Sequence, residues 1–166
     1  MNATVNRQVL LVEKPSGKLA PEHFKLVSGA VPEPGDGEAL LRTRLISLDA
    51  ANRAWMHGAT YRSAVEANSV MAGGSISEVV SSKAPNFAPG DLVFADTGWQ
   101  DYAALPAKHL TKMPKVEPMS YLLSVFGIAG LTAYFGLLHV GKPREGETVV
   151  VSAAAGSVGS IVGQIA

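Results

Sequence analysis

The stretch Val149-Val150-Val151-Ser152-Ala153-Ala154-Ala155-Gly156-Ser157-Val158-Gly159 decides the fold of the C-terminal part of this chain. It begins with an unbroken β-branched run, which is typical of a strand covered on both faces. From Ser157 onward, Val158, Ile161, Val162 and Ile165 keep the apolar spacing of a helix stripe. The small residues between these two patterns therefore predict a strand–turn–helix unit.

Such a unit can bind a phosphate group. Small residues let a phosphate approach the backbone, and free N–H groups at a helix N-terminus favour its negative charge. The dinucleotide fingerprint is G-x-G-x-x-G, and here Ala154, Gly156 and Gly159 stand at its three glycine positions. The residue that distinguishes NAD from NADP would lie beyond Ala166.

Upstream, from Gln8 to about Lys115, short strand patterns are separated by turn residues. Ala39–Leu48 alternates between apolar and polar residues, as a half-buried strand does. Met71–Ser82 contains a Gly73–Gly74 pair, which predicts a bulge or a close backbone approach. Further strands are expected at Gln8–Val12, Leu92–Phe94 and Trp99–Leu105. This spacing predicts a small antiparallel β-domain, either a barrel or a sandwich.

The uncharged run Met119–Leu138 is long enough to be a membrane-span candidate. Its glycines and hydroxyl residues favour instead a pair of buried helices, with Leu131, Phe135 and Leu138 on one stripe. We expect the domain boundary between residues 117 and 118. A parallel strand followed by a helix needs a second strand, so we expect these 166 residues to be the front part of a longer protein. The alternative is that residues 148–166 pack back on the β-domain.

Composition excludes several classes of function. The chain has 14 Lys+Arg, 14 Asp+Glu and no cysteine. Balanced charge argues against nucleic-acid and anionic-membrane partners. Without cysteine there is no disulfide, and the four histidines share no ligand spacing, so no metal is expected. Residues 1–7 lack the features of a secretory signal, and we expect a cytoplasmic protein.

The order of elements resembles the medium-chain dehydrogenase/reductase superfamily. Within it, the chain is similar to the zinc-free, NADP-dependent alkenal, prostaglandin and curcumin reductase branch. The resemblance covers essentially the whole chain and is carried by Ser47-Leu48-Asp49 with Arg53, and by residues 98–102, 130–138 and 149–160. It implies a mainly β fold, with a GroES-like β-barrel domain followed by helices and the first strand–turn–helix of a truncated Rossmann α/β domain.

The resemblance also implies an activity, namely hydride transfer from NADPH to the β-carbon of an α,β-unsaturated ketone or aldehyde. Gly156, Ser157, Val158 and Gly159 would contact the pyrophosphate of NADP, and Thr132 would lie near the nicotinamide. The isolated fragment is expected to be inactive, and its catalytic residues stay unassigned.

One segment departs from the branch. Many members carry Asp-Pro-Tyr-Met-Arg where this chain has Asp49-Ala50-Ala51-Asn52-Arg53, so the tyrosine that lines the substrate pocket is replaced by Ala51. Asn52 or the nearby Tyr61 is the candidate for a polar contact to the substrate instead. We also expect an ion pair between Asp49 and Arg53.

Two alternative functions stay open. A quinone reductase would share the cofactor geometry and differ in substrate. A non-catalytic interaction module is the second alternative, because the unpaired strand at Val149–Ser152 is an edge that can recruit another copy. We therefore expect a homo-oligomer.

Overall fold

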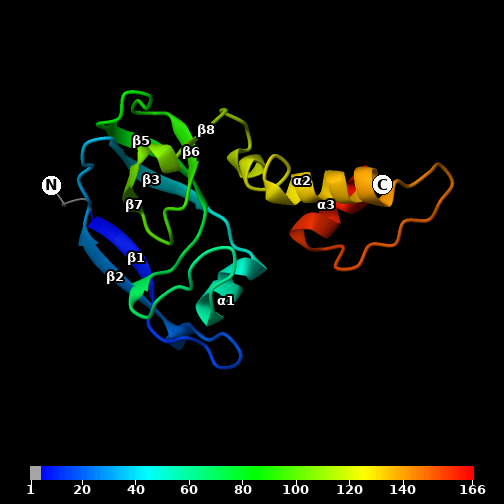
Figure 1. Ribbon diagram of the computed structural model, residues 1–166, viewed down its shortest axis with the longest axis horizontal. Coiled ribbons are helices and arrows are strands. Elements are labelled where there is room, and N and C mark those ends of the chain that lie inside the picture. Colours follow the sequence, from blue (N-terminus) through cyan, green and yellow to red (C-terminus); the bar gives the residue numbers. More distant parts are fainter. Residues whose placement is uncertain (1–4) are drawn as a thin grey trace. The chain divides into compact units, whose positions relative to one another are not determined.

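The computed structural model describes residues 5–166, which fall into two compact units (Figure 1). The first unit ends at Pro114 and the second runs from Lys115 to Ala166. The predicted boundary between residues 117 and 118 lies slightly further along the chain. Residues 1–4, part of the stretch inspected above for a secretory signal, lie outside the described residues.

The first unit is built from two antiparallel sheets, as the turn spacing predicts. One sheet has the strand order β2-β1-β4 and the other β7-β3-β5-β6-β8. The strands are β1 (Val5–Leu11), β2 (Phe24–Ala30), β3 (Glu38–Ile46), β4 (Ser69–Val70), β5 (Ser75–Ser82), β6 (Leu92–Ala95), β7 (Tyr102–Pro106) and β8 (Thr111–Met113). The unit also contains helix α1 (Ala50–His57) and the 3₁₀ turns η1 (Pro21–His23) and η2 (Ala107–His109).

The segment before β7 connects the two sheets. The Val9 N–H donates to the Trp99 carbonyl over 2.9 Å, and the Asp101 N–H donates to the Arg7 carbonyl over 3.0 Å. On its other side, the Asp101 carbonyl accepts from the Thr43 N–H at 2.8 Å. This segment thus bonds to β1 and to β3 and joins the two sheets into one β-domain.

Two buried apolar clusters stabilise the first unit. One lies on the five-stranded sheet and the other beneath α1. Burial of such side chains contributes about 25 cal/mol per Å² of apolar area removed from water. The first cluster consists of Ala39, Leu41, Val79, Val93, Ala95 and Leu110, and the second of Leu11, Trp55, Met56, Val65 and Met71.

A chain of buried hydroxyl groups also crosses the five-stranded sheet. Thr97 donates to Ser75 over 2.7 Å, and Ser75 lies 2.8 Å from the hydroxyl of Ser77. The Thr43 hydroxyl joins this chain at 3.3 Å from Thr97, and the Ala95 carbonyl accepts from Ser75 at 3.2 Å. Buried hydroxyls are costly without partners, so each member of the chain satisfies its neighbour.

Near Gly73–Gly74 the sequence predicts a bulge or a close approach, and the structure has the close approach: a Cβ atom on Gly73 would lie 2.7 Å from Nε1 of Trp99. The irregularities of the β3–β5 pair lie elsewhere, at Arg44 and Val80. The β3–β5 register shifts twice, between Leu40 and Leu41 and between Thr43 and Leu45. A Cβ atom on Gly74 would lie 2.8 Å from the end of the Phe94 ring, so this ring would have to shift to accept a larger residue.

Residues 49–53 form the start of helix α1, and their contacts differ from the predicted Asp49–Arg53 ion pair. Asp49 caps this helix, because its carboxylate accepts from the Ala51 N–H over 3.0 Å. Arg53 donates to the Gly17 carbonyl over 2.6 Å. The expected Asp49–Arg53 ion pair is therefore wrong. A carboxylate at a helix start is drawn to backbone N–H groups, which lie nearer than a side chain on the next turn.

The second unit is helical. It contains the 3₁₀ turn η3 (Met119–Leu122), helix α2 (Ile128–Tyr134), its π-helical continuation η4 (Phe135–Gly141) and helix α3 (Ser157–Ile165). α2 packs against α3. Lys142, in the left-handed conformation at φ 50°, ends η4.

Two expectations about the second unit are wrong. Residues 148–152 form no strand, because no other segment of the described chain pairs with them. The stripe expected to be buried is largely exposed, with 52% of Leu131, 51% of Phe135 and 39% of Leu138 accessible, since no described segment covers that face. Within residues 5–166, no helix is both long enough and apolar enough to cross a membrane.

Candidate functional site

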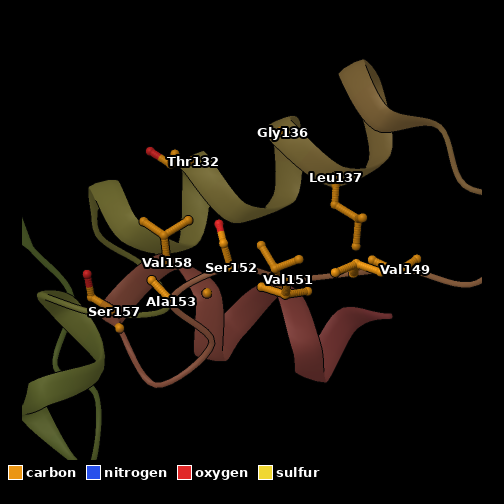
Figure 2. A pocket seen from close by; sticks show the side chains of 13 residues that line it. Thr132, Gly136, Leu137, Val149, Val151, Ser152, Ala153, Ser157 and Val158 are labelled. Atoms are coloured by element: carbon orange, nitrogen blue, oxygen red, sulfur yellow. The ribbon is translucent and has the colours of Figure 1, made fainter.

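A cavity of about 590 Å³ in the second unit brings the predicted cofactor residues together (Figure 2). It lies between the α2–η4 helix, the irregular segment 149–153 and the start of α3. Figure 2 shows Leu137 extending from η4 toward Val149. The lining residues are Thr132, Gly136, Leu137, Val149, Val150, Val151, Ser152, Ala153, Gly156, Ser157, Val158, Gly159 and Val162.

The turn that enters α3 depends on glycine at two positions. Ala153 has φ 50°, and its carbonyl accepts from the Gly156 N–H at 2.8 Å, which closes the turn. A Cβ atom on Gly156 would lie 3.1 Å from that carbonyl oxygen. A Cβ atom on Gly159 would collide with the same oxygen, so only glycine lets α3 start against this turn. Both positions match the second and third glycines of the fingerprint.

The start of α3 presents unpaired hydrogen-bond donors. The first helical bond runs from the Ser160 N–H to the Gly156 carbonyl over 2.9 Å. The N–H groups of Ser157, Val158 and Gly159 have no acceptor anywhere in residues 5–166. Because N–H groups at a helix start point outward along the axis, these three donors face away from the helix body.

This site can bind a phosphate group without a charged side chain. None of its lining residues carries a charge, and its polar side chains are the hydroxyls of Thr132, Ser152 and Ser157. The positive end of the helix dipole, equivalent to about half an elementary charge, is then the source of attraction for an anion. The residues that form the turn are small and exposed, so no side chain blocks it. These residues fit the diphosphate of a dinucleotide.

The two candidate substrate residues, Asn52 and Tyr61, both lie in the first unit and differ in burial. Asn52 is 5% exposed, and its amide is used at both ends: the carbonyl accepts from the Asp49 N–H at 2.7 Å, and the NH₂ donates to the Ala72 carbonyl at 3.1 Å. Tyr61 is 81% exposed, with its ring edge-on to Trp55 at 5.9 Å. A substrate contact by either residue stays a prediction.

A second cavity, of about 600 Å³, lies in the first unit and was not expected from the sequence. Neither Asn52 nor Tyr61 lines it. Its lining residues are Arg62, Ser63, Ala64, Val65, Glu66, Ser69, Val70, Ala72 and Asp96. They come from the loop after α1, from β4 and from the end of β6, three segments that no sequence motif connects. Within residues 5–166, no group of three or more His, Asp and Glu side chains is arranged to hold a metal ion.

Comparison with known proteins places this geometry in a family. The domain family described as the N-terminal domain of oxidoreductase matches residues 7–113. The chain is 44% identical over 162 residues to NADPH-dependent curcumin reductase of Escherichia coli (strain K12), covering 96% of this chain and 47% of that protein. It is 39% identical over 147 residues to prostaglandin reductase 1 of Bos taurus, covering 86% of this chain and 43% of that protein.

The chain is also similar to a solved structure from the same group of proteins. CurA from Vibrio vulnificus, in complex with NADPH, matches with a TM-score of 0.86 at 42% identity, over 96% of this chain and 48% of that chain. The β-domain and the strand-less fingerprint turn together define the N-terminal part of a medium-chain dehydrogenase/reductase. The chain belongs to the NADP-dependent branch of that superfamily that contains the curcumin, prostaglandin and alkenal reductases. It spans about half the length of the curated relatives it matches.

Proposed function

We propose that the protein containing this chain transfers a hydride from NADPH to the carbon–carbon double bond of an α,β-unsaturated ketone or aldehyde. The observation that carries the proposal is the set of three unpaired N–H groups at the start of α3, beside a cavity that Thr132 also lines. The names of the relatives, an NADPH-dependent curcumin reductase among them, support this cofactor and this substrate class.

The chain's own residues contribute binding and orientation. The N–H groups of Ser157, Val158 and Gly159 hold the diphosphate, which supplies the acceptors that they lack within the described chain. Thr132 lines the same cavity from α2 and would contact the nicotinamide ring of a bound NADPH. When bound, NADPH supplies the hydride, and the protein supplies position and electrostatics. Of the two candidate substrate contacts, Tyr61 is the better supported, because the amide of Asn52 is already bonded at both ends.

NADPH binding to the 166-residue chain tests the site directly. Gly159→Ala introduces a Cβ atom into the Ala153 carbonyl, whereas Gly163→Ala places one in open space on the same helix. We expect Gly159→Ala to weaken binding at least about tenfold, a loss of about 1.4 kcal/mol, and Gly163→Ala to leave binding unchanged. Titration followed by NADPH fluorescence measures both. Equal binding by the two variants would contradict the assignment of the turn.

Turnover tests the reaction. A longer protein that contains this chain should consume NADPH in the presence of an enone such as 4-phenyl-3-buten-2-one, followed by loss of the NADPH absorbance band. The isolated chain is expected to show no turnover. Consumption with menadione but not with the enone would replace this proposal by the quinone reductase. Absence of turnover with both substrates in the longer protein would remove the enzyme hypothesis.

Self-association is a further part of the proposal. Large apolar side chains are exposed along α2 and η4, among them Ile128 at 77% and Val140 at 80%. Apolar surface of this kind favours contact with another chain. We therefore expect the isolated chain to form a homo-oligomer, which light scattering at several concentrations would detect. A monomer at every concentration would contradict this expectation. A cytoplasmic location likewise stays a prediction.

A further inference from the structure

The cavity in the first unit has a cation at its edge. Arg62 lines it, and 31% of the Arg62 side chain is exposed. The centre of its guanidinium lies 4.6 Å above the ring of Trp55, which is itself 5% exposed. This is a cation–π distance, so the buried indole attracts the guanidinium and helps to hold it at the cavity.

The hydrogen-bonding capacity of Arg62 is largely unused. Its nearest carboxylate is Asp96, and the Nη1–Oδ1 distance is 3.6 Å, longer than a hydrogen bond. Within residues 5–166 the guanidinium donates no hydrogen bond. Arginine has five N–H donors in a planar fork that matches a carboxylate, so most of this fork is available to a ligand.

A carboxylate on a ligand would form a better pair with Arg62 than Asp96 does. A bidentate arginine–carboxylate pair has N–O distances of about 2.8 Å, well below the 3.6 Å seen here. Asp96 is 63% exposed, so water solvates it readily after displacement. The other carboxylate of the cavity, Glu66, is 80% exposed and lies 3.8 Å from the ammonium of Lys14, which offsets its charge.

We propose that Arg62 binds the carboxylate of an acidic ligand in this cavity of the first unit. The binding of this carboxylate does not depend on the proposed function. The remaining lining side chains are small or apolar, which suits the body of such a molecule: Ser63, Ala64, Val65, Ser69, Val70 and Ala72.

Binding of a matched pair of probes to the 166-residue chain tests the inference. The probes are 4-oxo-4-phenylbutanoate, which is a saturated keto acid that cannot be reduced at a double bond, and its methyl ester. The readout is the shift of the Trp55 indole N–H signal in a proton–nitrogen NMR spectrum, with Trp99 as the internal reference. We expect the acid to bind at least about tenfold more tightly than the ester.

Two substitutions should move the affinity in opposite directions. Arg62→Gln removes the cation and should abolish the preference for the acid. Asp96→Asn removes the competing carboxylate and should tighten binding of the acid about threefold or more, without changing binding of the ester. If the Arg62–Asp96 pair only stabilised the fold, Arg62→Gln and Asp96→Asn would change the affinity for the acid in the same direction. The spectrum itself shows whether each variant is folded, and Asp96→Asn keeps the test valid if Arg62→Gln does not fold.

Equal binding of acid and ester, or no gain from Asp96→Asn, would overturn the inference. NADPH binding at the start of α3 is measured separately. Its failure would refute the proposed function without affecting the carboxylate site, and the reverse result would leave the reductase proposal in place.

Discussion

Replacing Asn52 with alanine should destabilise the first unit more than any exposed substitution on α1. The side chain is 5% exposed, and its amide holds the Asp49 N–H and the Ala72 carbonyl. Alanine leaves both backbone groups without this partner, at about 1 to 3 kcal/mol each. The higher helix propensity of alanine offsets about 0.6 kcal/mol. The expected loss in the free energy of unfolding is therefore about 1.5 to 5 kcal/mol.

Tryptophan fluorescence during urea denaturation is the appropriate assay. Both tryptophans, Trp55 and Trp99, lie in the first unit, so the signal reports on that unit alone. For an m-value of about 1.5 kcal/mol/M, the midpoint should fall by about 1 to 3 M urea. His57→Ala, on the exposed last residue of the same helix, is the control and should change stability by less than about 0.5 kcal/mol. A loss below about 0.5 kcal/mol for Asn52→Ala would refute the structural role and return Asn52 to the substrate candidates.

Three further predictions concern the first unit. The hydrogen bond from Arg7 holds the pKa of Asp101 below its ordinary value. The pair therefore stabilises the fold above the unfolded pKa of about 4, and this stabilisation is lost as the pH falls through the folded pKa. The melting temperature of Asp101→Asn should accordingly vary less with pH in the acid range than that of the unmodified chain. Gly98→Ala should cost about 1 to 3 kcal/mol in urea unfolding, because Gly98 has φ 71° and an added Cβ atom would lie 3.0 Å from the Met71 carbonyl oxygen. Leu41→Ala, in the fully buried cluster of the five-stranded sheet, should cost about 2 to 5 kcal/mol by the same measurement.

Much of the β-domain could be predicted because its signals are local. The alternation in β3 depends on a few neighbouring residues, and it is present from Leu41 to Leu45. β2 was missed because its residues are mostly exposed and it is defined by pairing with β1 along its whole length. α1 was missed because eight residues carry little periodicity, although Asp49 followed by Asn52 is a recognisable start signal.

The candidate sites also include one part that could be predicted from the sequence and one that could not. The turn at Gly156 and Gly159 could be predicted from the sequence, because the spacing of these glycines follows from their close contact with the backbone of Ala153, a few residues away. The cavity beside Arg62 could not be found, since Arg62 and Asp96 are distant in sequence and meet only in the folded sheet. The expected strand at residues 148–152 was wrong for a related reason: a β-branched run becomes a strand only where another segment offers hydrogen bonds.

The buried hydroxyl chain limits which mutations the β-domain can accept. Each hydroxyl of Ser75, Ser77 and Thr97 serves as a partner for the next, so a single change to alanine deprives a neighbour of its acceptor or donor inside the core. Replacing all three together removes their demand for partners along with the supply, although the half-buried Thr43 hydroxyl and the Ala95 carbonyl each lose a bond. Among descendants of this sequence, these positions should therefore vary as a group, and a lone substitution at one of them should be rarer than the joint one.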